Sequence, residues 1–312
     1  MPTELLMRNV ALLAKVEATY GVDPVPAAAN AILVSDVKLT PMNMRTVSRD
    51  LIRSFLGSSE QLPTEIYTGI EFTCELAGSG AAGTAPALGP LLRACGFAET
   101  INAGVSVVYA PVSTGFESLT FHANLDGVLH KGLGARGTVR LSLKNHDRPT
   151  ARFMFQGIFV AVADAALPAV DLSAWQRPQP VNKTNTPGIT LHGYSAPLSD
   201  LQIDVANQVQ FKSFVGGTDF VQITDRSVTG NVLMQAVKVA DKNWWTAISG
   251  ATVAPLEMIH GTVAGNIVEI DAPNVQIHTP DYQDEDGIRM LSAQLALPPG
   301  ATGNDELVLT FR

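Results

Sequence analysis

The side chains that could carry out chemistry are few in this sequence and lie far apart. No two of the six histidines stand three or four residues apart, and no HExxH pattern occurs, so the usual spacing of metal ligands is missing. No GxSxG pattern is present to hold a nucleophilic serine on a sharp turn. The sequence therefore predicts no catalytic residues, no metal and no cofactor, and we expect a protein that is not an enzyme.

Three other features admit a ligand but have simpler interpretations. The glycine-rich run 78–89 precedes a short expected helix, as a phosphate-binding loop does, but it lacks the Lys-Ser/Thr pair of a P-loop, which favours a flexible loop. The acidic cluster 281–287 offers oxygen ligands for Ca²⁺ without the EF-hand spacing, which favours a solvated turn. The adjacent Trp244 and Trp245 either stack on a sugar or base, or anchor a helix in the core.

Composition and charge describe a globular protein with an acidic second part. The 312 residues are 46% hydrophobic and 16% charged, enough for one large β domain or two ordinary domains. Residues 1–187 carry 15 Lys/Arg and 15 Asp/Glu, whereas residues 188–312 carry 6 and 14, which accounts for the net charge of −8. Tight nucleic-acid binding needs basic residues to neutralise phosphates, so the composition argues against it. Passage of DNA without binding is compatible with this charge.

Cysteines and apolar runs indicate where the protein resides. Cys74 and Cys95 are too few to staple a chain of this size and show no CxxC spacing, so we expect reduced thiols in a cytoplasmic compartment. The first ten residues lack the long apolar run of a signal peptide. The most apolar later stretch, 154–170, is broken by polar residues and a proline, so we expect no membrane span.

Period-two alternation dominates the chain and predicts a mainly β fold. Apolar residues alternate with polar ones at 70–76 and again at 139–144, as in strands with one buried face. Two segments instead show helical spacing, 85–97 and 240–250, the second with Asp241 as its expected N-cap. Each half of the chain is thus expected to have one short helix among many strands.

Four landmarks recur in the same order along the two halves. The strand openings VSDVKLTPMN and LSDLQIDVAN begin 164 residues apart, at 34 and 198 (198 − 34). A Thr-Gly strand (68–69 and 229–230), a helix and a final pair of strands (137–160 and 273–297) follow in each half, and the last pair aligns Arg152 with Arg289. These matches predict an internal duplication; the alternative is a single elaborated β-sandwich.

The duplication and the composition together suggest domain boundaries. The stretch 164–195 is rich in Pro, Asn and Thr and has no period, as in a linker. We therefore expect an N-terminal arm at 1–29, a first domain at 30–163, this linker, and a second domain at 196–312.

The most informative stretch is 8–41, with an opening strand followed by Lys15-x-Glu17-x-x-Tyr20-Gly21-x-Asp23, two prolines and a Ser-Asp strand. This stretch resembles the start of the major tail tube proteins of long-tailed, siphophage-type bacteriophages. The rest of the chain is similar to that family in organisation more than in motif. The resemblance implies two tandem tail-tube-type β-sandwich or barrel domains, each with one short α-helix.

The resemblance also implies a function and partners. Such proteins are structural virion proteins that polymerise as stacked rings into a tail tube, the conduit for DNA ejection. Two domains in each chain imply trimeric, pseudo-hexameric rings. The implied partners are other copies of the chain, a tape measure protein, a tail terminator, and double-stranded DNA that passes without specific binding. The implied location is the virion tail, after assembly in the cytoplasm of the bacterial host.

Two segments are candidates for contacts between subunits or rings. The segment 43–64 is much longer than its counterpart near 211–218, and we interpret it either as a hairpin loop or as an arm that reaches the next ring. The second candidate arm is 1–29, with an apolar face before a proline-rich spacer. The expected contact residues are Leu12, Leu13, Val16, Arg45, Arg49, Leu51, Ile52, Arg53 and Phe55.

Other functions remain open at this point. A different virion or injection-machine component on the same fold, such as a tail terminator or a secretion tube, is one. A carbohydrate-binding β-sandwich is another, and it needs Trp175, Trp244 and Trp245 as exposed platforms. For a tail tube, we expect a lumen that withholds cationic contacts from DNA, with the acidic second domain supplying much of its wall.

Overall fold

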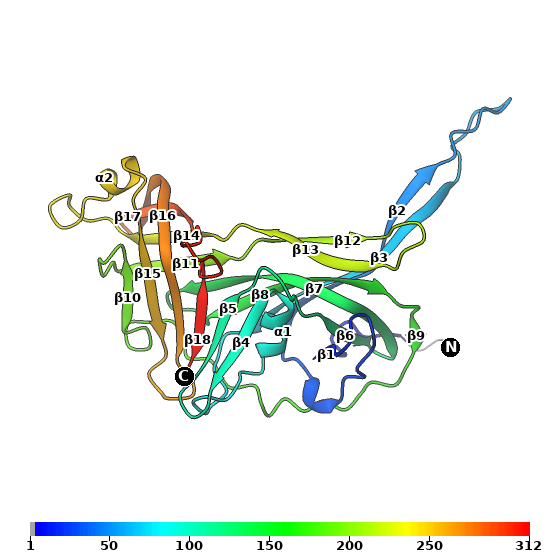
Figure 1. The fold of residues 1–312 in the computed structure, drawn as a ribbon, viewed down its shortest axis with the longest axis horizontal. Helices are drawn as coiled ribbons and strands as arrows, with labels where there is room; N and C mark the ends of the chain where they lie inside the picture. Colours follow the sequence, from blue (N-terminus) through cyan, green and yellow to red (C-terminus); the bar gives the residue numbers. More distant parts are fainter. Residues whose placement is uncertain (1–3) are drawn as a thin grey trace.

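The computed structural model describes residues 4–312, so residues 1–3 of the expected arm 1–29 lie outside the described residues. The chain is mainly β, as predicted, and almost all its strands belong to one antiparallel network (Figure 1). The first half contains β1 (Val10–Val16), β2 (Ser35–Ser48), β3 (Gln61–Glu75), β4 (Phe97–Asn102), β5 (Ser106–Pro111), β6 (Leu119–Leu125), β7 (Val128–Lys144), β8 (Thr150–Phe159) and β9 (Ala163–Asp164). A 3₁₀ turn at Ala28–Asn30 and α1 (Gly89–Ala94) complete it.

The second half has a similar set of elements. Its strands are β10 (Gly188–Leu191), β11 (Leu198–Asp204), β12 (Asn207–Lys212), β13 (Phe220–Arg226), β14 (Thr229–Gln235), β15 (Val253–His260), β16 (Val268–Glu285), β17 (Ile288–Ala296) and β18 (Val308–Phe311), with α2 (Trp244–Ser249) between β14 and β15. Strands β12 and β13 form a separate two-stranded hairpin.

Strand pairing follows one path in each half. In the first half, neighbours run β1-β6-β7-β8-β3-β2, and in the second they run β10-β15-β16-β17-β14-β11. The two paths join where β7 pairs with β11, with Leu141 opposite Ile203. The result is an eight-stranded run, β2-β3-β8-β7-β11-β14-β17-β16. A second junction forms where β18 pairs with both β16 and β5.

One face of the eight-stranded run is buried and the other is open. Alternate residues such as Phe72, Phe153, Leu141 and Leu201 are at most 2% exposed and belong to one hydrophobic cluster that spans both halves. The alternation of apolar and polar residues accounts for these inward faces, because a strand directs successive side chains to opposite sides. We call the opposite side of the run the open face.

Several local expectations need correction. Helix α1 is shorter than the expected 85–97, and α2 is capped by Asn243, whose side chain accepts a hydrogen bond from the Thr246 amide, rather than by Asp241. The Thr-Gly pairs are also out of register, because Thr68 points into the core whereas Thr229 is exposed. A one-residue offset moves a strand residue to the other face.

The expected Arg152–Arg289 match is likewise out of register. Arg152 lies in the middle of the sheet opposite Arg140 of β7, whereas Arg289 lies at the tip of the β16–β17 hairpin opposite Asp284. Shared order along the sequence therefore located corresponding strands but not corresponding residues.

The proline-rich stretch 164–195 packs against the body rather than standing apart from it. Val181 and Leu191 are buried, and His260 of β15 holds the stretch through its ring. Its Nε2 donates to the Gln179 carbonyl at 3.0 Å, which leaves Nδ1 to accept from the Thr186 hydroxyl at 3.0 Å. Burial lowers the pKa of His260, so the neutral ring is the one that fits.

This contact predicts a pH-dependent stability. Since the pKa of His260 is lower in the folded chain than its ordinary 6.5, the stabilisation is complete above pH 6.5 and declines as the pH falls below that value. We expect the free energy of unfolding, measured by urea denaturation from about pH 7.5 to about pH 5, to fall with pH. His260→Gln, which cannot titrate in this range, should give a shallower dependence. Identical slopes for the two proteins would contradict the assignment.

Candidate functional site

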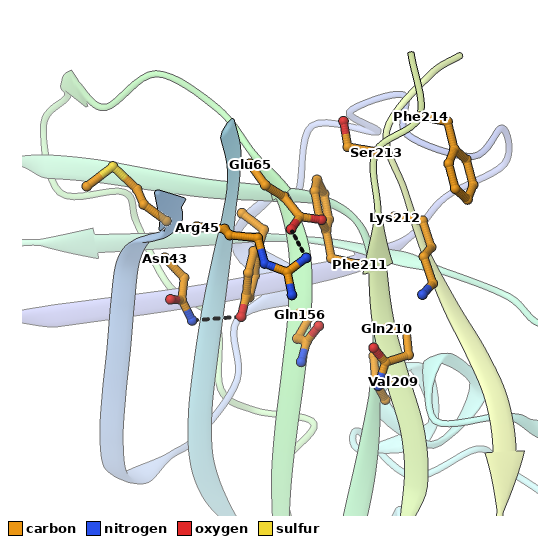
Figure 2. Close-up of a pocket in the computed structure, with 12 residues that line it drawn as sticks. Asn43, Arg45, Glu65, Gln156, Val209, Gln210, Phe211, Lys212, Ser213 and Phe214 are labelled. Atoms are coloured by element: carbon orange, nitrogen blue, oxygen red, sulfur yellow. Dashed lines mark hydrogen bonds and ion pairs between the residues drawn. The ribbon is translucent and has the colours of Figure 1, made fainter. Parts of the chain in front are cut away.

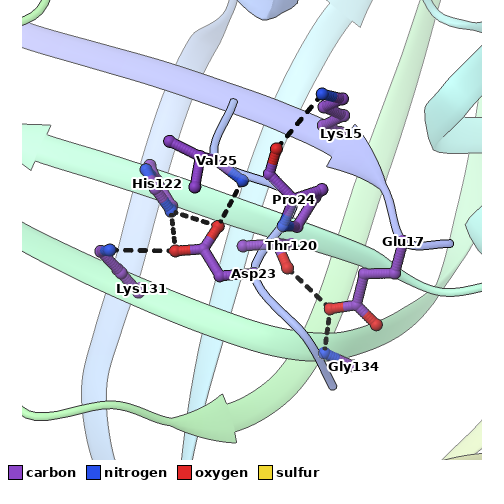
Figure 3. A network of polar contacts seen from close by, with 9 residues as sticks. All are labelled: Lys15, Glu17, Asp23, Pro24, Val25, Thr120, His122, Lys131 and Gly134. Carbon is purple, nitrogen blue, oxygen red and sulfur yellow. Dashed lines mark hydrogen bonds and ion pairs between the residues drawn. The ribbon is translucent and has the colours of Figure 1, made fainter. Parts of the chain in front are cut away.

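The polar motif of the N-terminal segment is a buried network around Glu17. The Glu17 carboxylate accepts hydrogen bonds from the Ser118 hydroxyl at 2.7 Å and the Thr120 hydroxyl at 2.6 Å. It also accepts from the backbone amides of Gly21 and Gly134, both at 2.7 Å. Figure 3 shows the contacts with Thr120 and Gly134. A buried carboxylate is costly unless such donors surround it, and here four donors do. Glu17 therefore ties the end of β1 to β6 and to β7.

A second cluster holds the following residues of the motif. Asp23 lies 3.0 Å from both the His122 ring and the Lys131 ammonium, and it accepts from the Val25 amide at 2.8 Å (Figure 3). Partial burial acts to raise the pKa of Asp23, but the hydrogen bonds from Lys131 and Val25 and the nearby His122 outweigh it and lower the pKa. Lys15 donates to the Pro24 carbonyl at 3.2 Å. The motif is thus a structural lock for this segment.

Tyr20 extends the lock to the second half of the chain. Its hydroxyl accepts a hydrogen bond of 2.6 Å from the Val221 amide of β13. The Arg136 guanidinium lies over the Tyr20 ring, 5.0 Å from its centroid, and donates to the Val221 carbonyl at 2.8 Å. Gly134 is needed beside this ring, because its φ is +56° and a Cβ there would lie 2.6 Å from Tyr20. Tyr20 and Arg136 therefore fasten the β12–β13 hairpin to the first half.

The β12–β13 hairpin lies along β7 and β8 and bounds one end of the open face (Figure 1). Asn207 donates to the carbonyls of Cys95 and Gly137 at 2.7 and 2.9 Å, and Phe211 stacks on Tyr67 with ring centroids 5.3 Å apart. A hollow of about 580 Å³ separates this hairpin from the base of β2–β3 (Figure 2). Its walls include the Arg45–Glu65 ion pair and amides but no nucleophile–base pair.

The long β2–β3 hairpin stands out from the body of the chain (Figure 1). Its outer part exposes apolar side chains that a lone chain leaves in water: Met44, Val47, Leu51, Ile52, Phe55, Leu56 and Leu62. Three predicted arginines accompany them: Arg45 pairs with Glu65, while Arg49 and Arg53 pair with Glu60. Exposed apolar side chains gathered on one projection mark an interaction surface.

The expected contact residues of the N-terminal segment lie elsewhere. Leu12 and Leu13 are each 2% exposed, because β1 pairs with β6 and directs them into the chain's own core. Val16 is half-buried at the end of the same strand. Leu12 and Leu13 therefore serve the core of their own chain, and Val16 lies at its margin. The apolar run that suggested an arm is instead a short core strand.

Two strand edges of the eight-stranded run are free. In residues 4–312, β2 has a ladder partner only on its β3 side, and residues 277–285 of β16 have one only on their β17 side. The β2 edge carries Lys38, and the β16 edge carries Asp281 and Glu285. Free edges are ready to pair with another strand.

The open face differs between the halves. In the first half it carries both charges, including Lys38, Glu71 and Arg152. On β14 and β17 it carries uncharged residues such as Asn231 and Gln294. The acidic excess of the second half lies instead at the β16–β17 tip and on β15 and β16, where Glu257, Glu269 and Asp271 gather. The free edge of β16 thus carries acidic residues of the second half, whereas β14 and β17 carry none.

Among the described residues, the other side chains that could bind a metal or react are not brought together. Among residues 4–312, no group of three or more His, Cys, Asp and Glu side chains is placed to hold a metal ion. Cys74 and Cys95 are buried, which raises the pKa of both thiols. In the same range, no helix is both long enough and apolar enough to cross a membrane.

The tryptophans do not form the exposed platform that a sugar-binding site would use. Trp244 is 3% exposed, and Trp175 donates to the Ala31 carbonyl at 2.9 Å. Trp245, 41% exposed, meets Tyr282 edge to face. The buried Trp244 and the bonded Trp175 argue against the carbohydrate-binding alternative.

Comparison with known proteins gives one result. Residues 7–298 match the sequence model of a family described as phage tail tube protein. A search of curated proteins found no match.

The hydrogen bond between Tyr20 and Val221 predicts that removal of the tyrosine hydroxyl destabilises the β12–β13 hairpin locally. Tyr20→Phe leaves the Val221 amide without its partner, and we expect a loss of about 1–2 kcal/mol in unfolding free energy. Hydrogen exchange should become faster in β12 and β13 and stay unchanged in β7 and β8. Tyr194→Phe is the matched control, because in the described part of the chain that hydroxyl has no hydrogen-bond partner. Unchanged exchange at 220–226 would show that Tyr20 is not the fastener.

Proposed function

Because the chain belongs to the phage tail tube protein family, we propose that it polymerises as stacked rings of three chains to form the tail tube through which DNA is ejected. The protein is a structural component of a phage tail. The free edges at the two ends of the eight-stranded run carry the proposal, because pairing them between chains closes a sheet into a ring.

A duplicated unit supports the three-chain ring. The two halves share one pairing order, with β1, β6, β7, β8, β3 and β2 corresponding to β10, β15, β16, β17, β14 and β11. Each half also has its short helix between corresponding strands. On this proposal, each half is one tail-tube-type domain, and three chains provide the six domains of a pseudo-hexameric ring. The proposed boundaries follow the two paths, with 164–195 as the connection.

The junction inside the chain indicates how chains meet. Strand β7 of the first unit pairs with β11 of the second, and the corresponding strands are β16 and β2 of the next chain. Carrying the β7–β11 register over places Lys38 of one chain opposite Gln283 of the other, between Asp281 and Glu285. Opposite charges on neighbouring strands stabilise such a pairing, and like charges oppose it. The β16 edge therefore complements the β2 edge of a second copy.

The dimensions suit a conduit. Three chains supply 24 strands in the closed sheet (3 × 8). With strands about 4.8 Å apart and tilted about 40° from the axis, such a sheet has a diameter of roughly 48 Å between backbones. After side chains are subtracted, this diameter leaves room for a double helix.

The β2–β3 hairpin is the proposed contact between stacked rings. It projects beyond the body, and its apolar residues, among them Leu51, Ile52 and Phe55, need a partner surface. A tape measure protein inside the tube and a terminator at its end are the further partners that the family resemblance implies. Assembly in the host cytoplasm belongs to the same proposal.

The ring closure predicts a specific cross-link. Lys38→Cys combined with Gln283→Cys places two thiols opposite each other between chains, while Cys74 and Cys95 stay buried. After oxidation or treatment with a short thiol cross-linker, assembled protein should run as a covalent trimer on a non-reducing gel. Lys38→Cys with Gln276→Cys is the out-of-register control and should not cross-link.

The cross-linking result tests the proposed number of chains in a ring separately from the proposed tube function. A covalent hexamer would keep the tube and overturn the ring of three. Tubes seen by electron microscopy that never cross-link would overturn the edge pairing, and a chain that never polymerises would overturn the tube itself.

The stacking role predicts a separation of two assembly steps. Ile52→Ser with Phe55→Ser and Leu56→Ser removes three exposed apolar side chains without touching the core. Electron microscopy should then show single rings but no long tubes, with unchanged thermal unfolding of the monomer. Val105→Ser with Val263→Ser removes exposed apolar side chains from turns on the body and should leave tubes intact. Tubes of normal length from the hairpin variant would contradict the role.

A further inference from the structure

Three basic side chains on the open face, Lys38, Arg140 and Arg152, are paired with carboxylates of neighbouring strands. Arg152 of β8 donates to Glu71 of β3 at 2.8 Å, and the other oxygen of that carboxylate lies 3.8 Å from Lys38 of β2. Arg140 of β7 donates through Nε and Nη2 to one oxygen of Asp204 on β11, at 3.0 and 2.6 Å. These pairs follow one another across five adjacent strands of the same sheet.

Fold stability does not account for these pairs. The arginine side chains are about half exposed, at 51% for both Arg140 and Arg152. Ion pairs in such positions contribute about 0–1 kcal/mol each, because water screens them and ordering two long side chains costs entropy. Their larger physical effect is on the electrostatic potential over the face, where each of these three cations is compensated within a few ångströms.

On β14 and β17 the open face lacks charge, while β11 adds Asp200 and the free edge of β16 adds Asp281 and Glu285. The outward positions of β14 and β17 include Asn231, Gln235, Ser292 and Gln294. Amide and hydroxyl groups hydrogen-bond water well and offer a passing phosphate no net positive charge. The cations of β2, β7 and β8 on this face are thus paired with carboxylates, while β14 and β17 carry no charge there and β16 carries carboxylates.

The opposite face of the run cannot line a channel. It is covered by the hydrophobic core and by packed elements, with α1 lying between β7 and β1. In a ring closed through β2 and β16, the open face is therefore the one left to point inward. A polyanion moving along the lumen would meet this face at every ring.

We propose that the paired charges and amides of the open face make it a non-adhesive surface for double-stranded DNA, with Glu71 and Asp204 acting to neutralise Arg152, Lys38 and Arg140. This inference rests on the proposed tube function. DNA affinity comes mainly from cations that replace the counterions of phosphates, and each free cation adds to it. A cation that already has a carboxylate partner on the next strand gains little from a phosphate. The acidic wall expected from composition is thus not required.

The test removes the carboxylates and leaves the cations. Glu71→Gln with Asp204→Asn frees Arg140 and Arg152 on the open face and removes one carboxylate beside Lys38, without changing side-chain shape. Tubes of the variant are incubated with a fluorescent DNA duplex in about 0.1 M salt and pelleted. We expect at least a tenfold gain in retained DNA over wild-type tubes, with retention falling steeply as salt is raised.

The matched control changes the same amount of charge elsewhere. Glu257→Gln with Glu269→Gln lies on β15 and on the part of β16 that pairs with β15 and β18, beyond the β16–β17 ladder. Its tubes should retain no more DNA than wild type. Equal gains in both variants would show that net charge, rather than this face, controls binding, and would overturn the proposal. Wild-type tubes that already retain the duplex at this salt concentration would overturn it too.

A second variant guards against loss of folding. Ser142→Lys adds an unpaired cation on the open face of β7 while all the ion pairs stay in place. Its tubes should also retain DNA, and a variant that forms tubes without this gain contradicts the proposal. Electron microscopy of each preparation reports tube formation separately. Absence of tubes from the wild-type chain counts against the proposed function, whereas tubes with unexpected DNA retention count against this inference alone.

Discussion

The pairing of β7 with β11 is the contact on which the arrangement of the chain depends. Five residue pairs, from Asp200–Lys144 to Asp204–Arg140, join the strands of the two halves into one sheet. Both strands direct side chains such as Leu141 and Ile203 into one hydrophobic core, so the junction is buried on one side and hydrogen-bonded along its length. Because β12 continues directly from β11, the same junction places the β12–β13 hairpin along β7 and β8. The Tyr20 hydroxyl then helps to hold the hairpin there through its hydrogen bond with the Val221 amide.

Sequence alone was informative where a physical rule is local. Alternation at 70–76 predicted a buried face correctly, because side-chain direction in a strand depends only on the strand itself. The Lys-x-Glu-x-x-Tyr-Gly-x-Asp motif located the N-terminal lock, although its function as an internal fastener depends on Val221, 201 residues beyond Tyr20. No local signal connects those two residues.

The sequence could not predict which strands pair with each other or in which register they pair. An apolar run such as Leu12-Leu13 has the same pattern whether it packs against its own chain or against another, and here β6 supplies its partner. The aligned Thr-Gly pairs fell on opposite faces, because β pairing tolerates one-residue offsets that ordered landmarks do not detect. Composition also located the acidic excess in the second half without indicating which surface carries it. Each of these points concerns long-range geometry.

The charges at the two free edges give the proposed assembly a direction. A free strand edge can pair with any other, including its own copy, and such pairing leads to aggregation. Two β16 edges would bring Asp281 and Glu285 together with their counterparts, so those edges repel. Pairing β2 with β16 instead places Lys38 between Asp281 and Glu285. A heterologous contact of this kind closes when its rotation divides a full turn, and otherwise gives an open helix. The β7–β11 junction already applies the same contact once within the chain, so the rotation between chains equals the rotation between halves when the two junctions match. A closed ring then follows, because every junction has the same geometry. Half of the junctions lie within a chain, and the other half lie between chains.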